Sequence, residues 1–259
     1  MIHIIITDYN LGLYRKDNST RKVLINSIET KINADQWMEK RLDVFRKFTV
    51  PSIENQSNNN FIWFIRIDPQ TPKSDITKIN NSLSSDNMII VLTDYRDVSR
   101  VIPKTVQWAL ITNFDNDDIL SLDFVEKVQS IFRNFSSHGE YLIDVNLFLY
   151  LSGDLTTFYM HNVALRRRIQ PGFCSSHATI VRPINMKQRR EPFIIRHTVL
   201  ANSISNILCC DAVGARIIHD TNVCTRMPPK TSWKHGPITN IQGESLEWLG
   251  QTFGIDKNS

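Results

Sequence analysis

Glycine and cysteine are both scarce in this sequence, and their scarcity argues against two kinds of site. Among the 259 residues there are 9 glycines and 4 cysteines. Gly12 stands alone behind the first apolar segment, so the glycine-rich phosphate loop expected of a nucleotidyltransferase is missing. No two cysteines have the C-x-x-C spacing of a zinc site. We therefore expect reduced and mostly buried thiols, as in a cytosolic protein.

Long apolar runs are also missing. None approaches the roughly 20 residues that an α-helix needs to span a bilayer. Residues 1–6 are apolar, but neither a basic region nor a small-residue cleavage site flanks them, so we expect a first β-strand there instead of a signal peptide. These features predict a cytoplasmic protein, with at most peripheral contact to a membrane.

The charge balance is mildly basic, and by itself it selects no partner. The net charge is +4 and the isoelectric point is about 8.9. Such an excess suits an anionic substrate, an acidic glycan, a membrane surface or nucleic acid. The sequence lacks the interleaved aromatic and basic residues, or the recognition motif, of a nucleic-acid-binding domain. We therefore expect no nucleic-acid partner.

Four apolar segments without alternation are the main structural signal, and each leads to an aspartate. They cover 4–7, 61–67, 88–93 and 108–113, and they lead to Asp8, Asp68, Asp94 and Asp115. Continuous apolar strands are typical of a parallel sheet that helices cover on both faces. Ligands of such sheets bind beyond the carboxyl ends of the strands. The aspartates are therefore predicted to gather where a ligand binds.

Helical patterns lie between these segments. We expect a helix that Asp35 caps and Pro51 ends, a second that starts at Ser74–Asp75, and a third after Ser121. A hairpin is predicted around 152–154, a late strand at 212–219 and a last short helix at 245–250. The fold class is therefore α/β, with a mixed, mainly parallel sheet flanked by helices. We expect one domain, 1–259, with a nucleotide-sugar-binding half (1–120) and an acceptor-side half (121–259).

The strongest chemical signal is the acidic run from Asp115 to Asp118. Asp115 and Asp117 are two residues apart at the end of a predicted buried strand, where a turn lets both carboxylates reach one cation. Mg²⁺ and Mn²⁺ favour carboxylate and phosphate oxygens, and such a cation neutralises charge on a departing nucleoside diphosphate. The alternative is a polar turn that feeds a helix. The buried strand before the motif favours a Mn²⁺ or Mg²⁺ site.

Several groups of residues occur in an order that resembles the rhamnosyltransferase family of glycosyltransferase-A-like enzymes. They are Trp37 with Arg41, Pro51-Ser52-Ile53 with Gln56, Phe61-Ile62-Trp63, Asp68 with Thr71-Pro72, Asp115 to Asp118, and His219 with Asn222. The resemblance extends over residues 1–225. It implies a glycosyltransferase-A-like, Rossmann-like fold, a divalent metal, and transfer of rhamnose or another deoxyhexose from a nucleotide sugar.

The resemblance also implies roles for individual residues. Donor-binding roles fall on Thr7, Tyr9, Arg41, Asp68, Asp115 and Asn116, and the metal ligands are Asp115, Asp117 and His219. His197 is the second choice for the histidine ligand. Asp211 is the first candidate for a catalytic base, and Glu191 and Asp144 are alternatives, because the base must reach the acceptor hydroxyl.

The sequence thus predicts a metal-dependent hexosyltransferase. Its donor is expected to be a UDP- or dTDP-sugar, and its acceptor a glycan or a lipid-linked glycan. Three other functions stay open: a nucleotidyltransferase acting on sugar phosphates, a metal-dependent nuclease and a nucleic-acid-binding protein. Binding of a nucleoside diphosphate that requires Mn²⁺ separates the transferase from a nucleic-acid binder, whose DNA retention depends steeply on salt.

Overall fold

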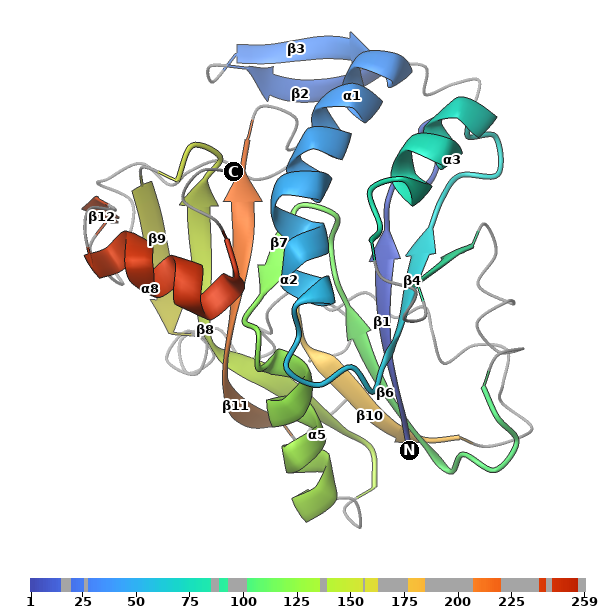
Figure 1. The fold of residues 1–259 in the computed structure, drawn as a ribbon, viewed down its shortest axis with the longest axis vertical. Coiled ribbons are helices and arrows are strands. Elements are labelled where there is room, and N and C mark those ends of the chain that lie inside the picture. Colours follow the sequence, from blue (N-terminus) through green and yellow to red (C-terminus); the bar gives the residue numbers. More distant parts are fainter. Residues whose placement is uncertain are drawn as a thin grey trace.

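A computed structural model shows one mixed sheet of ten strands, with helices packed against it (Figure 1). The structure describes residues 1–14, 20–25, 28–84, 89–92, 102–135, 139–155, 157–162, 177–184, 207–219, 238–240 and 244–255. Along the main path of hydrogen-bonded neighbours in this sheet, the strands lie in the order β12-β9-β8-β10-β6-β1-β4-β5. The predicted α/β fold with a mixed sheet and flanking helices is confirmed.

The N-terminal half supplies a parallel block of four strands. These are β1 (Ile2–Asp8), β4 (Ile62–Arg66), β5 (Ile89–Leu92) and β6 (Trp108–Asn113), which match the four predicted apolar segments. β1 pairs with β4 on one side and with β6 on the other, and β5 lies outside β4. Strands β4 and β5 are therefore added on one side of β1 and β6 on the other, so the order of strands reverses between β1 and β6. In open α/β sheets, this switch point is where ligands bind.

The C-terminal half adds mostly antiparallel strands to the same sheet. They are β7 (Asp118–Leu120), β8 (Tyr141–Ser152), β9 (Thr157–Asn162), β10 (Thr179–Pro183), β11 (Ile207–Ile218) and β12 (Ile238–Asn240). β10 joins the two halves, because it pairs antiparallel with both β6 and β8. The predicted hairpin is present as β8 and β9, and the predicted strand at 212–219 is the second part of β11. The proposed functional division at residue 120 stays a prediction.

A separate two-stranded hairpin lies beside the first long helix (Figure 1). It consists of β2 (Thr20–Ile25) and β3 (Ile28–Asn33), paired antiparallel. The sequence analysis did not predict it. No tight-turn dipeptide such as Asn-Gly joins the two strands, so the usual hairpin signal is missing.

The first helical segment corrects two predictions. α1 (Ala34–Val44) begins after Asn33, whose side chain accepts from the backbone N–H of Gln36, so Asn33 and not Asp35 is the cap. Nor does Pro51 end the helix. The segment continues through a π-helical turn, η1 (Phe45–Thr49), into α2 (Val50–Glu54). A wider turn just before Pro51 accommodates a residue that cannot donate a backbone hydrogen bond.

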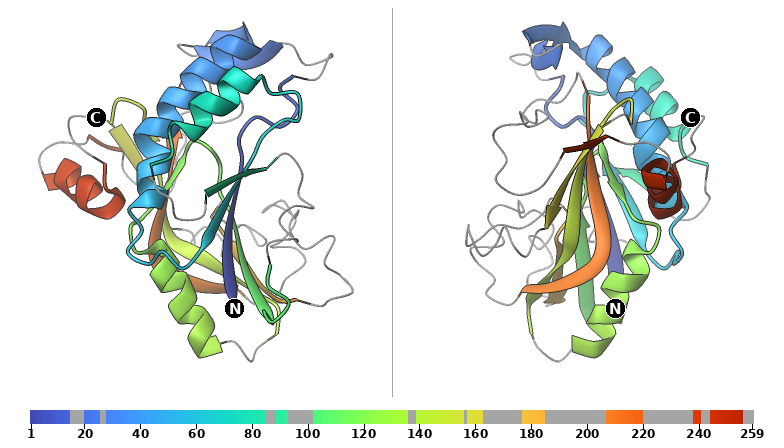
Figure 2. Two further views of the ribbon diagram at one scale, coloured as in Figure 1. Left: turned by 45° about the vertical axis from the view of Figure 1, so that its right-hand side comes forward. Right: turned by 90° about the vertical axis from the view of Figure 1, so that its left-hand side faces the viewer.

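The remaining described helices are α3 (Lys73–Asn80), α5 (Phe124–Phe135) and α8 (Glu244–Phe253). They agree with the three other predicted helices in place, although α8 is longer than expected. Figure 2 shows these helices and the α1–α2 segment on the same face of the sheet. Among the described residues, no helix combines the length and the hydrophobicity that a membrane crossing requires.

The core occupies both faces of the parallel block, which explains the unbroken apolar strands. Along β1, Ile5 packs in the cluster that contains Trp37 and Phe45 of the helices. Ile4 and Ile6 point the other way, into a second cluster with Ile102. Cys210 is buried, as predicted, whereas the side chains of the other cysteines lie outside the described residues.

His3 in β1 gives the protein a predictable acid sensitivity. Its side chain is fully buried, Nε2 lies 3.0 Å from Thr112 Oγ1, and burial lowers its pKa to about 3. The unfolded chain takes up this proton near pH 6.5, so stability falls as the pH falls from 6.5 toward 3. At pH 5 the loss due to His3 is about 2 kcal/mol. Urea unfolding of wild type and His3→Asn at pH 7.5 and pH 5 should show a smaller acid loss in the variant, and equal losses would contradict the assignment.

Candidate active site

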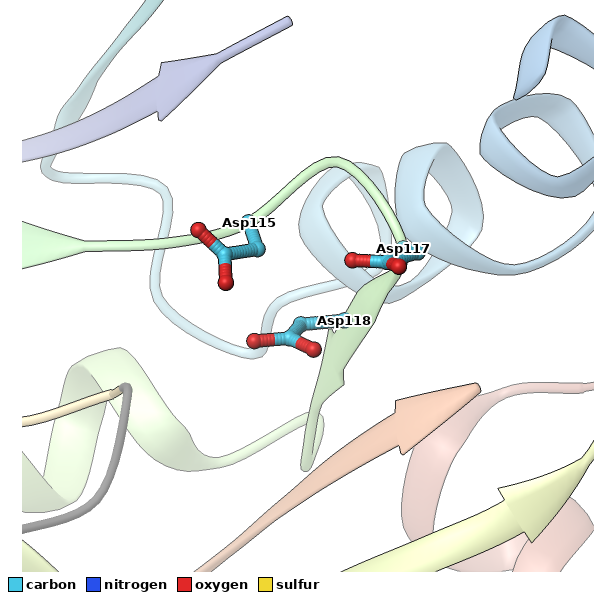
Figure 3. A group of neighbouring side chains, drawn as sticks. All are labelled: Asp115, Asp117 and Asp118. Atoms are coloured by element: carbon cyan, nitrogen blue, oxygen red, sulfur yellow. The ribbon is translucent and has the colours of Figure 1, made fainter. Parts of the chain in front are cut away.

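Three aspartates gather at the turn that leads from β6 into β7, beyond the carboxyl end of β6 (Figure 3). Asp115, Asp117 and Asp118 each offer a carboxylate oxygen, and these atoms lie within 4.8 Å of one another. The turn adjoins the end of β1, because the N–H of Phe114 donates to the carbonyl of Ile6 at 2.9 Å. The predicted convergence of Asp115 and Asp117 is therefore present, whereas Asp8 and Asp68 do not belong to this group and Asp94 lies outside the described residues.

Hydrogen bonds from three other segments fix the backbone of this turn. The Thr49 hydroxyl in η1 lies 3.1 Å from the carbonyl oxygen of Asn116 and 3.0 Å from that of Asp118, and it can donate to either. The N–H of Ile217 in β11 donates to the carbonyl of Asp117 at 2.9 Å. The Asn116 side chain donates to the carbonyl of Tyr9. The π-helical turn thus contributes directly to the position of the aspartates.

Asp117 is buried against a cation and an imidazole. Arg41 Nη1 lies 2.6 Å from Asp117 Oδ2, and His219 Nε2 lies 3.4 Å from the same oxygen. Arg41 Nη1 and His219 Nε2 are 3.2 Å apart, and the guanidinium stacks over Trp37 at 5.0 Å from the ring centre. Burial alone would raise the pKa of Asp117, but Arg41, His219 and Arg216 outweigh it and hold the pKa well below its ordinary value. Asp117 is therefore an anion at any physiological pH.

Asp118 is completely buried, and both of its carboxylate oxygens are occupied. Arg216 Nε lies 2.8 Å from Oδ1, and Arg216 Nη2 lies 3.1 Å from Oδ2. His177 Nε2 lies 3.0 Å from Oδ2, and its ring sits between Phe114 and Phe148. Burial would raise the pKa of Asp118, but Arg216 and His177 together lower it.

Asp115 is the accessible member of the group. Its side chain is 51% exposed, and it forms an ion pair with Arg216 Nη2. Desolvation by the surrounding protein is the larger cause, and repulsion from the Asp118 carboxylate the second, of a rise in the pKa of Asp115 to about 6. Of these two causes of the raised pKa, repulsion from Asp118 is the one that agrees best with a half-exposed Asp115 side chain. A divalent cation would relieve that repulsion.

The donor set suits a hard divalent cation. Asp115 and Asp117 supply carboxylate oxygens, and the His219 imidazole lies beside Asp117 on the side of Arg41. Mg²⁺ and Mn²⁺ take oxygen ligands, and Mn²⁺ also accepts imidazole. The structure brings Asp115 and Asp117 together and places His219 beside Asp117 but outside the group of three aspartates, and the role of all three predicted ligands stays a prediction.

The predicted donor-binding residues fall into two groups. Arg41, Asp115 and Asn116 lie at the acidic turn. The Asp68 carboxylate is buried, and it accepts backbone N–H groups from Gly12 at 2.7 Å and Gln70 at 2.8 Å, so it ties together the loops after β1 and β4. Thr7 accepts from Trp63 Nε1 at 2.9 Å, and the Tyr9 ring packs edge-on against Phe45. The structure thus shows these last three as parts of the buried frame, and their donor contacts stay predictions.

Neither of the two candidate bases that the structure describes, Asp211 and Asp144, belongs to the group of aspartates at the acidic turn. Asp211 is exposed in β11, five residues before Arg216, and its carbonyl accepts from Lys127 in α5. At about 3.3 Å per residue this places it roughly 16 Å along the strand from Arg216. Asp144 is fully buried in β8, and Glu191 and His197 lie outside the described residues.

Two residues that contact the acidic turn, Arg216 and His177, were not predicted from the sequence as members of the site. One feature of the sequence could have indicated Arg216, because this residue interrupts the apolar run of the predicted late strand. Nothing in the sequence around His177 points to Asp118. Gly214 explains how the histidine fits: a Cβ at this position would lie 2.0 Å from His177 Nδ1. A glycine is therefore required where β11 passes the imidazole.

Solved structures that resemble this chain are remote. TarS 1–349 of S. aureus is 14% identical, with 56% of this chain and 36% of that chain covered and a TM-score of 0.31, so the chain spans about a third of that protein. A nucleotide-diphospho-sugar transferase of Desulfovibrio desulfuricans G20 is 10% identical, with 85% and 84% covered and a TM-score of 0.39. The 4-diphosphocytidyl-2C-methyl-D-erythritol synthase of Anaerococcus prevotii is also 10% identical, with 81% and 87% covered and a TM-score of 0.37.

Family membership rests on a different comparison. No curated protein matches the chain. The model of the family described as "Putative rhamnosyl transferase" matches residues 18–231. The match contains the acidic turn, Arg41, His177, Arg216 and His219, which are the residues that form the site. The chain therefore belongs to this rhamnosyl transferase family.

Proposed function

We propose that this protein is a metal-dependent glycosyltransferase that moves rhamnose or another deoxyhexose from a UDP- or dTDP-sugar to a glycan or lipid-linked glycan. The observation that carries the proposal is the convergence of Asp115 and Asp117 at the switch point of the sheet. The same proposal places the enzyme in the cytoplasm, with peripheral contact to a membrane when the acceptor is lipid-linked.

Some residues of the site would bind the cation, and others fix the position of the acidic turn. A bound Mn²⁺ or Mg²⁺ would supply positive charge to the leaving diphosphate. Asp115 and Asp117 would hold this cation, with His219 beside them. Arg41 keeps Asp117 ionised and in place through the 2.6 Å contact. Thr49 and Ile217 fix the backbone of the turn, so the carboxylates need little rearrangement when the donor binds.

The proposal is tested by calorimetric titration of UDP, dTDP and GDP, with and without Mn²⁺. Wild type is expected to bind one of them tightly and only with Mn²⁺. Asp115→Asn and Asp117→Asn should each weaken this binding at least about tenfold, because a hydrogen bond or ion contact to a charged group contributes about 1.5–3 kcal/mol. Asp123→Asn is the matched control, since Asp123 is a half-exposed aspartate of the same segment that pairs with Lys127.

Asp115 is exposed, so the Asp115→Asn substitution leaves the buried ion pairs of Asp117 and Asp118 intact. A loss of binding in this variant is therefore not expected to result from unfolding. Circular dichroism verifies that each variant is folded. A folded wild type that binds no nucleoside diphosphate with Mn²⁺ would contradict the proposal, and the acidic turn would then be a structural turn before α5. Binding that persists in both variants but requires Mn²⁺ would place the cation elsewhere.

A further inference from the structure

We propose that Asp118 is not a ligand of the cation but the anchor of Arg216, and that the Arg216 guanidinium binds the diphosphate of the donor. This inference rests on the proposed function and adds a phosphate-binding residue to it. It leaves Asp115 and Asp117 as the proposed ligands of the cation and assigns to Asp118 the task of holding Arg216.

The contacts of Asp118 argue against a role as a ligand. The side chain is 0% exposed, and Arg216 and His177 approach both of its oxygens. A cation at Asp118 would have to displace the forked Arg216 contact from a site without solvent. Asp115 differs in both respects, because its side chain is 51% exposed and its only ion pair among the described residues is with Arg216.

The fold places Arg216 permanently opposite Asp118. β11 and β7 pair antiparallel, with Arg216 directly across from Asp118. The two Arg216 nitrogens that contact Asp118 form the fork that arginine uses for planar anions. The guanidinium is fixed at its Nε edge, and its Nη2 side extends toward the more exposed Asp115. The Arg216 side chain is itself 19% exposed.

The exchangeable contact is the one between Arg216 Nη2 and Asp115. A donor phosphate that approaches the turn can replace the Asp115 carboxylate at Nη2, while the buried Asp118 contact stays in place. The same exchange leaves the Asp115 carboxylate to the cation. Arginine suits this task because its planar fork holds an anion on one edge and can donate to a phosphate from the other nitrogens.

The experiment measures two affinities in Arg216→Gln, Arg216→Lys and Asp118→Asn. Mn²⁺ alone is titrated by electron paramagnetic resonance, and the preferred nucleoside diphosphate with saturating Mn²⁺ is titrated by calorimetry. In Arg216→Gln, Mn²⁺ alone should bind as tightly as in wild type or more tightly, because a competing cation is gone. The nucleotide should bind at least about tenfold more weakly, as expected for lost hydrogen bonds to a charged group. Arg216→Lys should lie between wild type and Arg216→Gln, because lysine keeps the charge but lacks the fork.

Asp118→Asn decides between an anchor and a ligand. The anchor predicts that Mn²⁺ affinity stays within about threefold, and that nucleotide affinity falls by a similar factor to Arg216→Gln, the scale of a charged hydrogen bond. A loss of Mn²⁺ binding like that in Asp115→Asn would overturn the inference, as would unchanged nucleotide affinity in Arg216→Gln. Arg133→Gln is the control, because Arg133 is an exposed arginine paired with Glu126.

Failure of this inference is distinguishable from failure of the proposed function. If wild type binds the nucleotide with Mn²⁺ and the Arg216 variants bind it equally well, only the role of Arg216 falls. If folded wild type binds neither Mn²⁺ nor nucleotide, both fall together. Circular dichroism and thermal unfolding of each variant show that the affinities refer to folded protein.

Discussion

Replacing Arg41 with methionine is expected to lower the free energy of unfolding by about 3–5 kcal/mol, the range for removal of one partner from a buried ion pair. The Arg41 and Asp117 side chains are 5% and 9% exposed, and their charged atoms are 2.6 Å apart. Methionine fills much of the volume against Trp37 but leaves the Asp117 carboxylate in a nearly dry site. The penalty therefore arises from the anion that stays behind.

The matched control is Arg46→Met in the adjoining π-helical turn. Arg46 donates to the Ser82 hydroxyl at 2.7 Å and to the Lys78 carbonyl at 3.0 Å, in an exposed setting. The same substitution there should cost no more than about 1 kcal/mol, as for other exposed polar contacts. Urea unfolding followed by circular dichroism gives both values. Equal costs for the two variants would mean that the Arg41–Asp117 pair is no more than a surface contact.

Gly214→Ala is expected to destabilise the protein by about 3 kcal/mol, at the upper end of the usual cost of overpacking. The new methyl group would meet His177 Nδ1 at 2.0 Å, and the buried imidazole already contacts the rings of Phe114 and Phe148. Either the ring leaves its place beside Asp118 or β11 moves away from β7. Because Arg216 belongs to the same strand, nucleotide binding should weaken as well.

A double-mutant cycle isolates the collision with His177. His177→Ala removes the ring, so adding Gly214→Ala to it should cost much less than Gly214→Ala does alone. Gly153→Ala is the control, since the nearest atom to its Cβ is the Ile218 carbonyl oxygen at an ordinary 3.4 Å. Thermal and urea unfolding measure the four proteins of the cycle and the Gly153→Ala control. Additive costs for Gly214→Ala and His177→Ala would show that the glycine serves some other purpose.

Local pattern was sufficient to predict the parallel block and its edge. Strands β1, β4 and β6 are buried on both faces, so their apolar runs are continuous and visible in the sequence. Asp115 and Asp117 follow the end of β6 in a short turn, so their proximity depends only on residues next to each other in the chain. Such features need no knowledge of distant partners.

Helix boundaries were less predictable, because tertiary contacts outweigh local preference there. Val50 before Pro51 favours an end to the helix, yet the segment continues through η1 into α2. Phe45, Phe48 and Thr49 are buried, and the Thr49 hydroxyl contacts the carbonyls of the acidic turn. Packing of this turn against β7 stabilises a wider helix that the sequence around Pro51 does not predict.

The sequence by itself determined the α/β fold, the four strands of the parallel block and the acidic turn that follows β6, because each depends on neighbours within a few residues. Only the tertiary structure decided that Asp117 pairs with Arg41, that Asp118 pairs with Arg216 and His177, and that Gly214 makes room for the imidazole. In the chain, Asp118 is 59 positions away from His177 and 98 positions away from Arg216. The physical reason is that charge pairing in a buried site depends on which side chains the sheet brings together, and that information lies in the pairing of β7 with β11, not in any local pattern.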